Sequence, residues 1–387
     1  MKDLSADLQQ TRQQQRYRSN RVLQRDGVIC RTEDGRELLA FCSNDYLGLS
    51  QHPQVVAAFQ RGAERYGVGS GAAHLINGHG PAHQALEEEL AEFLGRPRAL
   101  LFSTGYMANL ALISTLLGRG DWVVQDRLNH ASLLDGAQLS RARLKRYAHA
   151  DLADARQRLT QTGSGATLLA TDGVFSMDGD LAPLAELQCL CSQHHSWLLL
   201  DDAHGFGVLG KGRGTAAHYG LTATDDLIQM ITLGKALGTF GAAVVASEAV
   251  IETLIQRARP YIFTTASPPA NAEASRAALR LLASEHWRRE HLQALIARFR
   301  QGAEQIGLPL MASTTPIQPL LLGSEARALA WSRGLEQAGI LVSAIRPPTV
   351  PQGASRLRIT LSAEHSPEQV DRLLDALQNR GQMTDDR

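Results

Sequence analysis

The sequence has few cysteines, no excess charge of either sign and no long apolar run. Its 387 residues include four cysteines (Cys30, Cys42, Cys189 and Cys191) without metal-ligand spacing, which predicts free thiols in a reducing cytosol. Lys+Arg and Asp+Glu both number 39, so net charge gives no general attraction to nucleic acid or anionic membranes. No apolar run could span a bilayer, and the first ten residues lack a signal-peptide core. We therefore expect a soluble, cytoplasmic protein with no nucleic-acid or membrane partner.

From about residue 81 onward, short apolar segments alternate with helical ones. Pro81 begins one helix and Gly95 ends it. Most candidate strands are continuously apolar, as strands covered on both faces should be. These strands are residues 99–102, 122–125, 144–147, 167–171, 197–201, 227–232 and 242–246. The pattern predicts an α/β fold with a doubly wound, mostly parallel seven-stranded sheet.

The pattern changes near Pro268 and Pro269, after which a smaller C-terminal α/β domain is expected. A long helical stretch over 270–299, broken near 284–286, precedes the remaining elements. Those are strands at 317–322, 340–345 and 357–361, and helices at 326–338 and 367–378. Residues 2–16 form an arm or an amphipathic helix. The predicted division is an N-terminal segment (1–40), a large domain (41–270) and a small domain (271–387).

Chemically useful side chains follow several of the predicted strands. Lys235 lies in a glycine-flanked loop after strand 227–232, three residues beyond Thr232. A lysine in such a loop is commonly a solvated surface residue, but in a shaped pocket it can hold an aldehyde cofactor as a Schiff base. After strand 99–102, a hydroxyl-rich turn with Gly105 opens a helix. That turn is either a simple N-cap or a phosphate cradle.

Three further strand ends supply complementary groups. Asp201 and Asp202 end a buried strand, and His204 follows; His130 and Ser176 lie after two other strands. Singly these fit a surface histidine, an ordinary turn or a metal site, although the metal alternative lacks further ligands. Ligands of open parallel sheets bind beyond the carboxyl ends of the strands. Jointly the residues supply what pyridoxal phosphate needs: an amine, an anion site and an acid for its ring nitrogen.

Four motifs resemble the α-oxoamine synthases, pyridoxal-phosphate enzymes of the aspartate-aminotransferase fold type. They are residues 43–49 (SNDYLGL), 172–180 (DGVFSMDGD), 201–205 (DDAHG) and 344–351 (AIRPPTVP). The resemblance runs from about Tyr17 to the last helix. Residues 129–134 and 344–351 favour the branch that condenses L-alanine with pimeloyl-CoA or a pimeloyl carrier protein. An alternative is the branch that condenses glycine with acetyl-CoA, and another is a non-catalytic protein of this fold.

The resemblance also implies roles for individual residues. Lys235 would be the Schiff-base lysine and Asp201 the partner of the pyridine nitrogen, with His130 stacked on the ring. Ser176 and His204 would flank the phenolic oxygen, and Gly105, Tyr106 and Thr232 would hold the phosphate side. Arg358 would bind the amino-acid carboxylate, for which a guanidinium suits better than an ammonium group. Arg18 and Thr349 match positions that meet the acyl substrate.

The family resemblance also implies a homodimer with active sites at the subunit boundary. Residues 264–269 match a segment that can reach the neighbouring subunit's cofactor phosphate. Residues 69–78 depart from the family pattern, with His74 and Asn77 in place of typical residues. We expect this departure to affect substrate selection rather than the chemistry.

Overall fold

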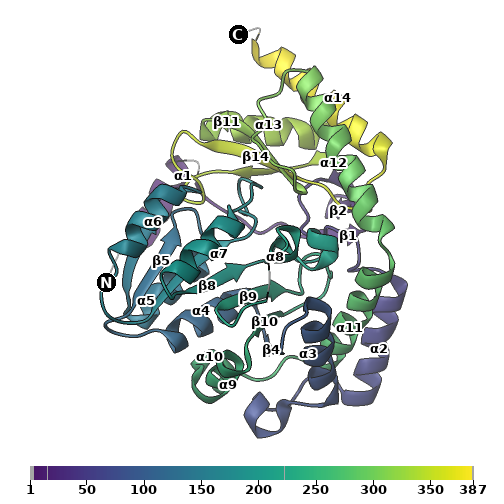
Figure 1. Ribbon diagram of the computed structural model, residues 1–387. Helices are drawn as coiled ribbons and strands as arrows, with labels where there is room; N and C mark the ends of the chain where they lie inside the picture. The colour runs from purple at the N-terminus through teal and green to yellow at the C-terminus, as the bar shows by residue number, and fades with distance from the viewer. Residues whose placement is uncertain (1–3, 15, 222, 386–387) are drawn as a thin grey trace. The chain divides into compact units, whose positions relative to one another are not determined.

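The computed structural model describes residues 4–14, 16–221 and 223–385 (Figure 1). The chain divides into two compact units, each described separately below. The larger unit comprises Leu47–Ser176 and Leu181–Trp287, and the smaller unit comprises Met1–Tyr46, Met177–Asp180 and Arg288–Arg387. In the described part of the chain, no helix is both long and apolar enough to cross a membrane.

The larger unit is built on a seven-stranded sheet of order β4-β10-β9-β8-β7-β5-β6. The strands are β4 (Arg98–Phe102), β5 (Trp122–Asp126), β6 (Arg143–Tyr147), β7 (Thr167–Asp172), β8 (Trp197–Asp201), β9 (Leu227–Thr232) and β10 (Ala242–Ala246). β10 pairs antiparallel with both of its neighbours, β4 and β9, and the other four pairs are parallel. The predicted mostly parallel sheet is therefore confirmed.

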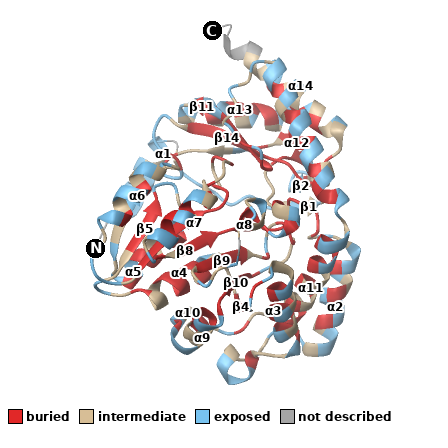
Figure 2. Ribbon diagram, viewed as in Figure 1, coloured by how far each residue is buried: buried red, intermediate tan, exposed pale blue. Residues whose placement is uncertain are grey.

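Both faces of this sheet are covered by helices. The elements of the unit are α2 (Pro53–Tyr66), η1 (His74–Gly78), α3 (Pro81–Leu94), α4 (Gly105–Leu116), α5 (Ala131–Ser140), α6 (Leu152–Thr160), α7 (Leu184–Gln193), η2 (Gly210–Gly212), α8 (Thr215–His218), α9 (Glu248–Arg257), α10 (Arg259–Ile262) and α11 (Pro269–Ser284). Leu199 of β8 packs in a core with α4, α5 and α9, whereas Leu198 and Leu200 pack with α6 and α7. This alternation follows from the two-residue period of a strand. It explains why β7 and β8 are buried nearly throughout (Figure 2).

The smaller unit contains two sheets and is built mainly from an N-terminal and a C-terminal segment of the chain. Its elements are α1 (Leu4–Gln13), β1 (Leu23–Asp26), β2 (Ile29–Thr32), β3 (Glu37–Ala40), α12 (Trp287–Gln305), β11 (Ile317–Gly323), α13 (Glu325–Gln337), β12 (Ile340–Leu341), β13 (Ser343–Ile345), β14 (Ser355–Thr360) and α14 (Pro367–Asp385). One sheet has the order β1-β2-β3-β12 and the other β11-β14-β13. β12 pairs in parallel with β3, so the N-terminal segment shares a sheet with the C-terminal part.

This division differs from the expected domains in several places, among them residues 41–46 and 177–180, which belong to the smaller unit. The N-terminal segment is not a separate arm, because β1–β3 pair with β12 in the smaller unit. The expected boundary at residue 270 moves to residue 287, because α11 packs against α2 and α3 of the larger unit. The expected single strand at 340–345 is two strands, β12 and β13, which belong to different sheets.

Candidate active site

A cavity of about 190 Å³ at the carboxyl end of the large sheet gathers all of the predicted cofactor residues. Its lining residues are Gly105, Tyr106, His130, Asp172, Ser176, Asp201, Ala203, His204, Met230, Thr232 and Lys235. They come from the ends of β5, β7, β8 and β9 and from the start of α4. The structure thus brings together every cofactor residue predicted from the sequence in this unit, although the roles of those residues stay predictions.

Lys235 lies in the turn that joins β9 to β10. The Leu233 N–H and the Thr232 hydroxyl both donate to the Gly241 carbonyl, at 2.9 and 3.1 Å. The Gly238 N–H donates to the Lys235 carbonyl at 2.9 Å, so the turn is closed on both sides of the lysine. Lys235 Nζ lies 2.7 Å from Nε2 of His204. An amine and an imidazole at this distance can exchange a proton.

Asp201 is a buried carboxylate that accepts two hydrogen bonds. The Ala203 N–H donates to Oδ1 at 3.1 Å and the Asn109 amide donates to Oδ2 at 2.7 Å. Asp201 forms no ion pair with any residue that the structure describes. A buried carboxylate is costly unless a cation or donors stabilise it. A protonated ring nitrogen is a cation of the required kind, so this observation fits pyridoxal phosphate.

The neighbouring carboxylate, Asp202, has a structural role. It accepts from the Thr215 N–H and hydroxyl at 2.8 and 2.6 Å, and from the Gln229 amide at 2.7 Å. Burial raises the pKa of Asp202 to about 7. A Cβ atom at Gly205 would overlap both Asp202 and Thr215, which explains the glycine of the DDAHG motif. In the DDAHG motif, Asp201 therefore lines the cavity, whereas Asp202 holds the loop in place.

Asn109 and Ser132 connect Asp201 to His130. The Asn109 amide donates both to Asp201 and, at 2.9 Å, to the Ser132 hydroxyl. That hydroxyl lies 2.7 Å from Nδ1 of His130, and the Ser132 N–H donates to the same nitrogen at 3.3 Å. Because a backbone N–H can only donate, Nδ1 accepts, which assigns the ring proton of neutral His130 to Nε2. Asn109 and Ser132 are fully buried.

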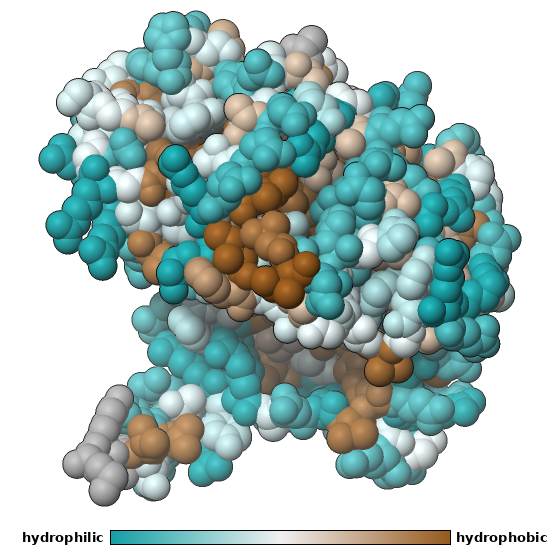
Figure 3. Space-filling view, turned by 90° about the horizontal axis from the view of Figure 1, so that it is seen from below, coloured by the Kyte–Doolittle hydropathy of each residue, from teal (hydrophilic) through white to brown (hydrophobic). Residues whose placement is uncertain are grey.

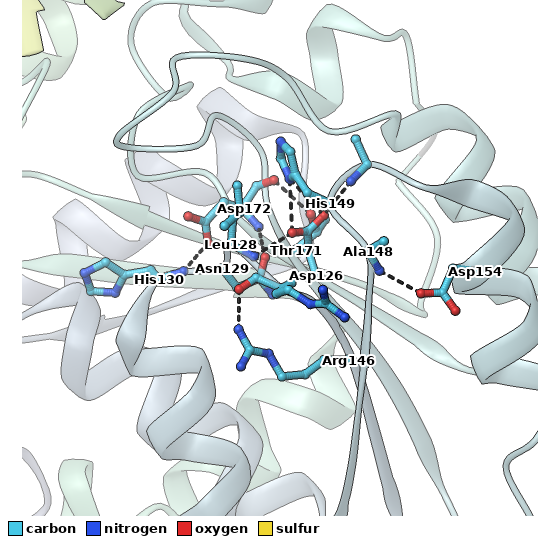
Figure 4. A network of polar contacts seen from close by, with 12 residues as sticks. Asp126, Leu128, Asn129, His130, Arg146, Ala148, His149, Asp154, Thr171 and Asp172 are labelled. Atoms are coloured by element: carbon cyan, nitrogen blue, oxygen red, sulfur yellow. Dashed lines mark hydrogen bonds and ion pairs between the residues drawn. The ribbon is translucent and has the colours of Figure 1, made fainter. Parts of the chain in front are cut away.

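A second polar network fixes His130 at the ends of β5 and β7 (Figure 4). The Asn129 amide donates to the Ala170 carbonyl at 2.8 Å, and its oxygen accepts from the Asp172 N–H at 3.1 Å. The His130 N–H donates to Asp172 Oδ1 at 3.1 Å. Asp126 accepts from the Leu128 N–H at 2.7 Å and from His149 at 3.1 Å. These bonds hold the loop that carries His130 onto the sheet.

Asp172 lies beside Asp201 because β7 and β8 are parallel and pair these two residues. Burial first, and then the nearby charge of Asp201, raise the pKa of Asp172 well above its usual value. Asp172, Asn109 and Ser132 were not predicted as site residues. The strand-end rule could have found Asp172, whereas Asn109 and Ser132 act through contacts that no local pattern contains.

The start of α4 is the candidate anion site. Thr104 caps the helix by accepting from the Met107 N–H at 3.2 Å, so the N-cap alternative is confirmed, whereas the phosphate cradle stays a prediction. Gly105 and Tyr106 are the first helical residues, where backbone N–H groups lack helical partners and favour negative charge. A Cβ at Gly105 would lie 3.3 Å from Met230, so glycine keeps this corner open. Together with the Lys235 amine and the Asp201 carboxylate, this corner completes a set that fits pyridoxal phosphate.

Three of the expected substrate residues, Arg18, Thr349 and Arg358, belong to the smaller unit, whereas His130 lies in the larger one. Arg358 on β14 is buried, and its two terminal nitrogens each donate to the Asn44 side-chain oxygen at 3.2 Å. Arg356, two residues earlier, is ion-paired with Asp178. That Arg358 binds a substrate carboxylate stays a prediction. Arg18 donates to the Thr349 hydroxyl at 3.1 Å, so these two expected acyl-site residues are in contact.

Residues 69–78 fold against the segment after α10. Ala73 forms a β-bridge with Thr265, and the Ser70 hydroxyl donates to the Ser267 carbonyl at 2.6 Å. The His74 ring stacks on Tyr261 with centroids 4.9 Å apart, and burial lowers the pKa of His74 to about 3. The departure from the family pattern thus places a neutral histidine in a packed position.

The last two expectations from the sequence concern a metal site and the four cysteines. Among the described residues, no group of three or more His, Cys, Asp or Glu side chains has a geometry that could hold a metal ion. All four cysteines are free thiols, and burial raises the pKa of Cys42 to about 11 and that of Cys191 to about 12. These two thiols are therefore poor nucleophiles.

Comparison with known proteins gives one family. The model of the family "Aminotransferase class I and II" matches residues 36–377. An 8-amino-7-oxononanoate synthase from Cellvibrio japonicus is 60% identical over 375 residues, covering 97% of this chain and 94% of the relative. The enzyme of the same name from Thioalkalivibrio sulfidiphilus is 59% identical over 379 residues, covering 97% of each chain.

Solved structures agree with this assignment. A serine palmitoyltransferase from S. paucimobilis with bound PLP–myriocin aldimine superposes with a TM-score of 0.92 at 30% identity, covering 98% of this chain and 97% of that one. The 8-amino-7-oxononanoate synthase from Francisella tularensis has a TM-score of 0.78 at 33% identity, covering 90% and 98%.

Proposed function

The chain belongs to the aminotransferase class I and II family, and from this premise we propose a reaction for it. Its cofactor is pyridoxal phosphate. It catalyses the decarboxylative condensation of L-alanine with a pimeloyl thioester, which gives 8-amino-7-oxononanoate, carbon dioxide and a free thiol carrier in biotin biosynthesis. The observation that carries this proposal is a complete cavity with Lys235, His204 and Asp201, in a chain 60% identical to an 8-amino-7-oxononanoate synthase.

When bound, the cofactor supplies an electron sink for the bonds around the alanine Cα. Asp201 holds the proton of the pyridine nitrogen, and the Asn109 amide at 2.7 Å keeps that carboxylate oriented. The N-terminus of α4 at Gly105 and Tyr106 binds the phosphate. Thr232 and Ser176 line the same cavity. The hydrogen bond between Nδ1 and Ser132 fixes the ring of His130, which also lines this cavity.

Lys235 moves the proton at the alanine Cα. Its amine removes that proton, after which Cα forms a bond to the thioester carbon, the carrier leaves as a thiol and the carboxylate leaves as carbon dioxide. His204, whose Nε2 lies 2.7 Å from Nζ, receives the proton from the lysine or returns it. A later reprotonation of Cα by Lys235 completes the exchange.

Arg358 binds the alanine carboxylate before it is lost. A guanidinium presents two parallel N–H donors to a carboxylate, and both terminal nitrogens of Arg358 already converge on one oxygen of Asn44. A substrate carboxylate can take the place of the neutral Asn44 oxygen as the acceptor of these two hydrogen bonds. Arg18 and Thr349 bind the acyl chain as a hydrogen-bonded pair.

The protein acts as a homodimer in this proposal. The exposed hydrophobic side chains of the larger unit include Ile76 at 78%, Phe263 at 69% and Leu75 at 48%. These residues lie in η1 and directly after α10, in or beside the two segments joined by the Ala73–Thr265 bridge. On the face seen in Figure 3, the most prominent group of hydrophobic residues is bordered by hydrophilic ones. Apolar surface of this kind favours burial by a second copy.

One assay tests the reaction directly. The purified protein, loaded with pyridoxal phosphate, is incubated with alanine and either pimeloyl-CoA or a pimeloyl carrier protein, and the product is identified by mass. We expect 8-amino-7-oxononanoate and one carbon dioxide per thiol released. Parallel reactions with glycine and acetyl-CoA, or with serine and palmitoyl-CoA, test the related condensations. Faster turnover in either of these would refute the proposed substrates.

A further inference from the structure

One edge of the large sheet carries a concentration of positive charge. Residues 127–161 include seven Lys or Arg and three Asp or Glu, which gives a net charge of +4, whereas the whole chain is neutral. β6 is the last strand on this side of the sheet. Five of the cations lie on β6, just before it or just after β5: Arg127, Arg141, Arg143, Lys145 and Arg146. We refer to these five residues as the basic edge.

The basic edge lacks carboxylate partners. None of its five cations forms an ion pair with a residue in the described part of the chain. Arg143 and Lys145 lie over the Trp122 ring, 5.0 and 5.2 Å from its centroid, and Lys145 also donates to the Gln161 side-chain oxygen at 2.9 Å. Both partners are uncharged, so these contacts hold the two side chains in place without neutralising them.

The three carboxylates within residues 127–161 already accept hydrogen bonds from other groups. Asp135 accepts from the Tyr106 hydroxyl, Asp151 from two N–H groups at the start of α6, and Asp154 from the Ala148 N–H and Arg158 at 2.8 and 2.9 Å. The Ala148 N–H first, and then Arg158 and Arg127, lower the pKa of Asp154. Arg127 therefore shares Asp154 with the cation that is ion-paired to it.

The basic edge reaches the loop that carries His130. Arg127 lies three residues before His130, and Arg146 donates to the Arg127 carbonyl (Figure 4). The Arg127 N–H donates to the Tyr147 carbonyl at 3.0 Å, so this loop begins at the carboxyl end of β6. From β6 to β8, which ends in Asp201, there are three strand spacings, or roughly 14 Å. A partner at the basic edge therefore lies beside the candidate active site.

Protection of an edge strand does not account for all of these residues. Charged side chains on an edge strand prevent other strands from adding to it, which explains the cations of β6. Arg127 and Arg141 lie outside the strand, however, and exposed leucines accompany them. Leu128 is 37% exposed and Leu139 is 59% exposed. Arginines combined with exposed apolar side chains are typical of a surface that binds another protein.

We propose that the basic edge binds an acidic protein that carries the pimeloyl thioester to the active site. This inference rests on the proposed function and selects a carrier protein from the two thioesters named there. The chain as a whole is neutral, so the attraction is directed to this edge. A carrier has to leave after each transfer, and charge complementarity speeds association without requiring slow dissociation.

The test compares pimeloyl carrier protein with pimeloyl-CoA as substrates of the holoenzyme and of its Arg127→Gln/Arg143→Gln variant. Neither side chain donates a hydrogen bond to a residue that the structure describes, so both can be replaced without breaking a network. At low salt we expect the KM for the carrier protein to rise about fivefold, with kcat and the KM for pimeloyl-CoA unchanged. The rise should disappear in about 0.5 M salt, where exposed charges are screened.

Arg61→Gln/Arg65→Gln is the matched control. It removes the same charge from exposed positions of α2, which lies on the opposite side of the larger unit from α6 (Figure 1). Both KM values should stay unchanged in this variant. An equal rise for the carrier protein in the control would mean that positive charge anywhere on the unit attracts it, and would overturn the proposal.

Three other outcomes also overturn the proposal. An equal rise in KM for both thioesters means that the basic edge attracts any polyanion. An unchanged KM for the carrier protein means that the protein does not bind there, and a rise that persists in high salt means that charge does not attract it. Calorimetric titration with the carrier protein measures the same difference without turnover. Weaker binding of the carrier protein to the Arg127→Gln/Arg143→Gln variant, with no product from either thioester in the wild type, would keep the docking surface and refute the proposed reaction.

Discussion

Replacing Asn109 with alanine tests whether the buried hydrogen bonds around Asp201 support catalysis. The substitution removes the donor that lies 2.7 Å from Asp201 and the donor that lies 2.9 Å from the Ser132 hydroxyl. A hydrogen bond to a charged group contributes about 1.5–3 kcal/mol. If Asp201 holds the ring-nitrogen proton, removal of this hydrogen bond raises the free energy of the transition state by this amount. We then expect kcat/KM to fall about 10- to 100-fold.

The assay measures steady-state turnover of alanine with pimeloyl-CoA, together with the pH dependence of kcat/KM and the thermal unfolding temperature. Ser132→Ala is the matched control, because it removes the link to His130 but leaves the Asn109–Asp201 bond in place. Its effect should be smaller than that of Asn109→Ala. A kcat/KM for Asn109→Ala within about twofold of the wild type, in a folded holoenzyme, would refute the reasoning.

Four further substitutions test separate parts of the proposal. Lys235→Ala should abolish turnover and the absorbance of the covalently held cofactor; multiple turnovers by this variant would contradict the role of the lysine. Arg358→Lys should raise the KM for alanine about tenfold but not that for the thioester, because an ammonium cannot form the two parallel bonds; an equal rise in both KM values would argue against a carboxylate site. Asp202→Asn should flatten the pH dependence of stability. Burial raises the pKa of Asp202 to about 7 in the folded state, so its contribution to stability is lost as pH rises from about 4 to about 7; identical slopes of unfolding temperature against pH would contradict this. Ile76→Glu should shift the protein from dimer to monomer in sedimentation, because the dimer would bury a side chain that is 78% exposed in one chain; an unchanged sedimentation profile would place the interface elsewhere.

The larger sheet could be predicted because its signals are local. β7 and β8 are mostly apolar runs, and they end in the carboxylates Asp172 and Asp201. Parallel strands align their carboxyl ends, so residues after different strands must meet at one edge. That rule alone is enough to place Lys235, His204 and His130 near one another.

The smaller unit was harder to predict because its pairings are not local. β3 and β12 are separated by about three hundred residues, and β12 is only two residues long. Neither the N-terminal strands nor the split between β12 and β13 has a distinctive pattern. Likewise, α11 appears in the sequence as the start of a new helical region. Its packing on α2 and α3, which assigns it to the larger unit, depends on surfaces far away in the chain.

By itself, the sequence determined the types of side chain available at the strand ends, since apolar runs and turn residues act over a few positions. It thereby determined that Lys235, Asp201 and a helix N-terminus would share one site. Only the tertiary structure decided which groups support them. The Asn109–Asp201 bond joins residues 92 apart, and the Arg358–Asn44 bond joins residues 314 apart. Hydrogen bonds require atoms within about 3.2 Å, and only the packed register of strands and helices brings such distant residues to that separation.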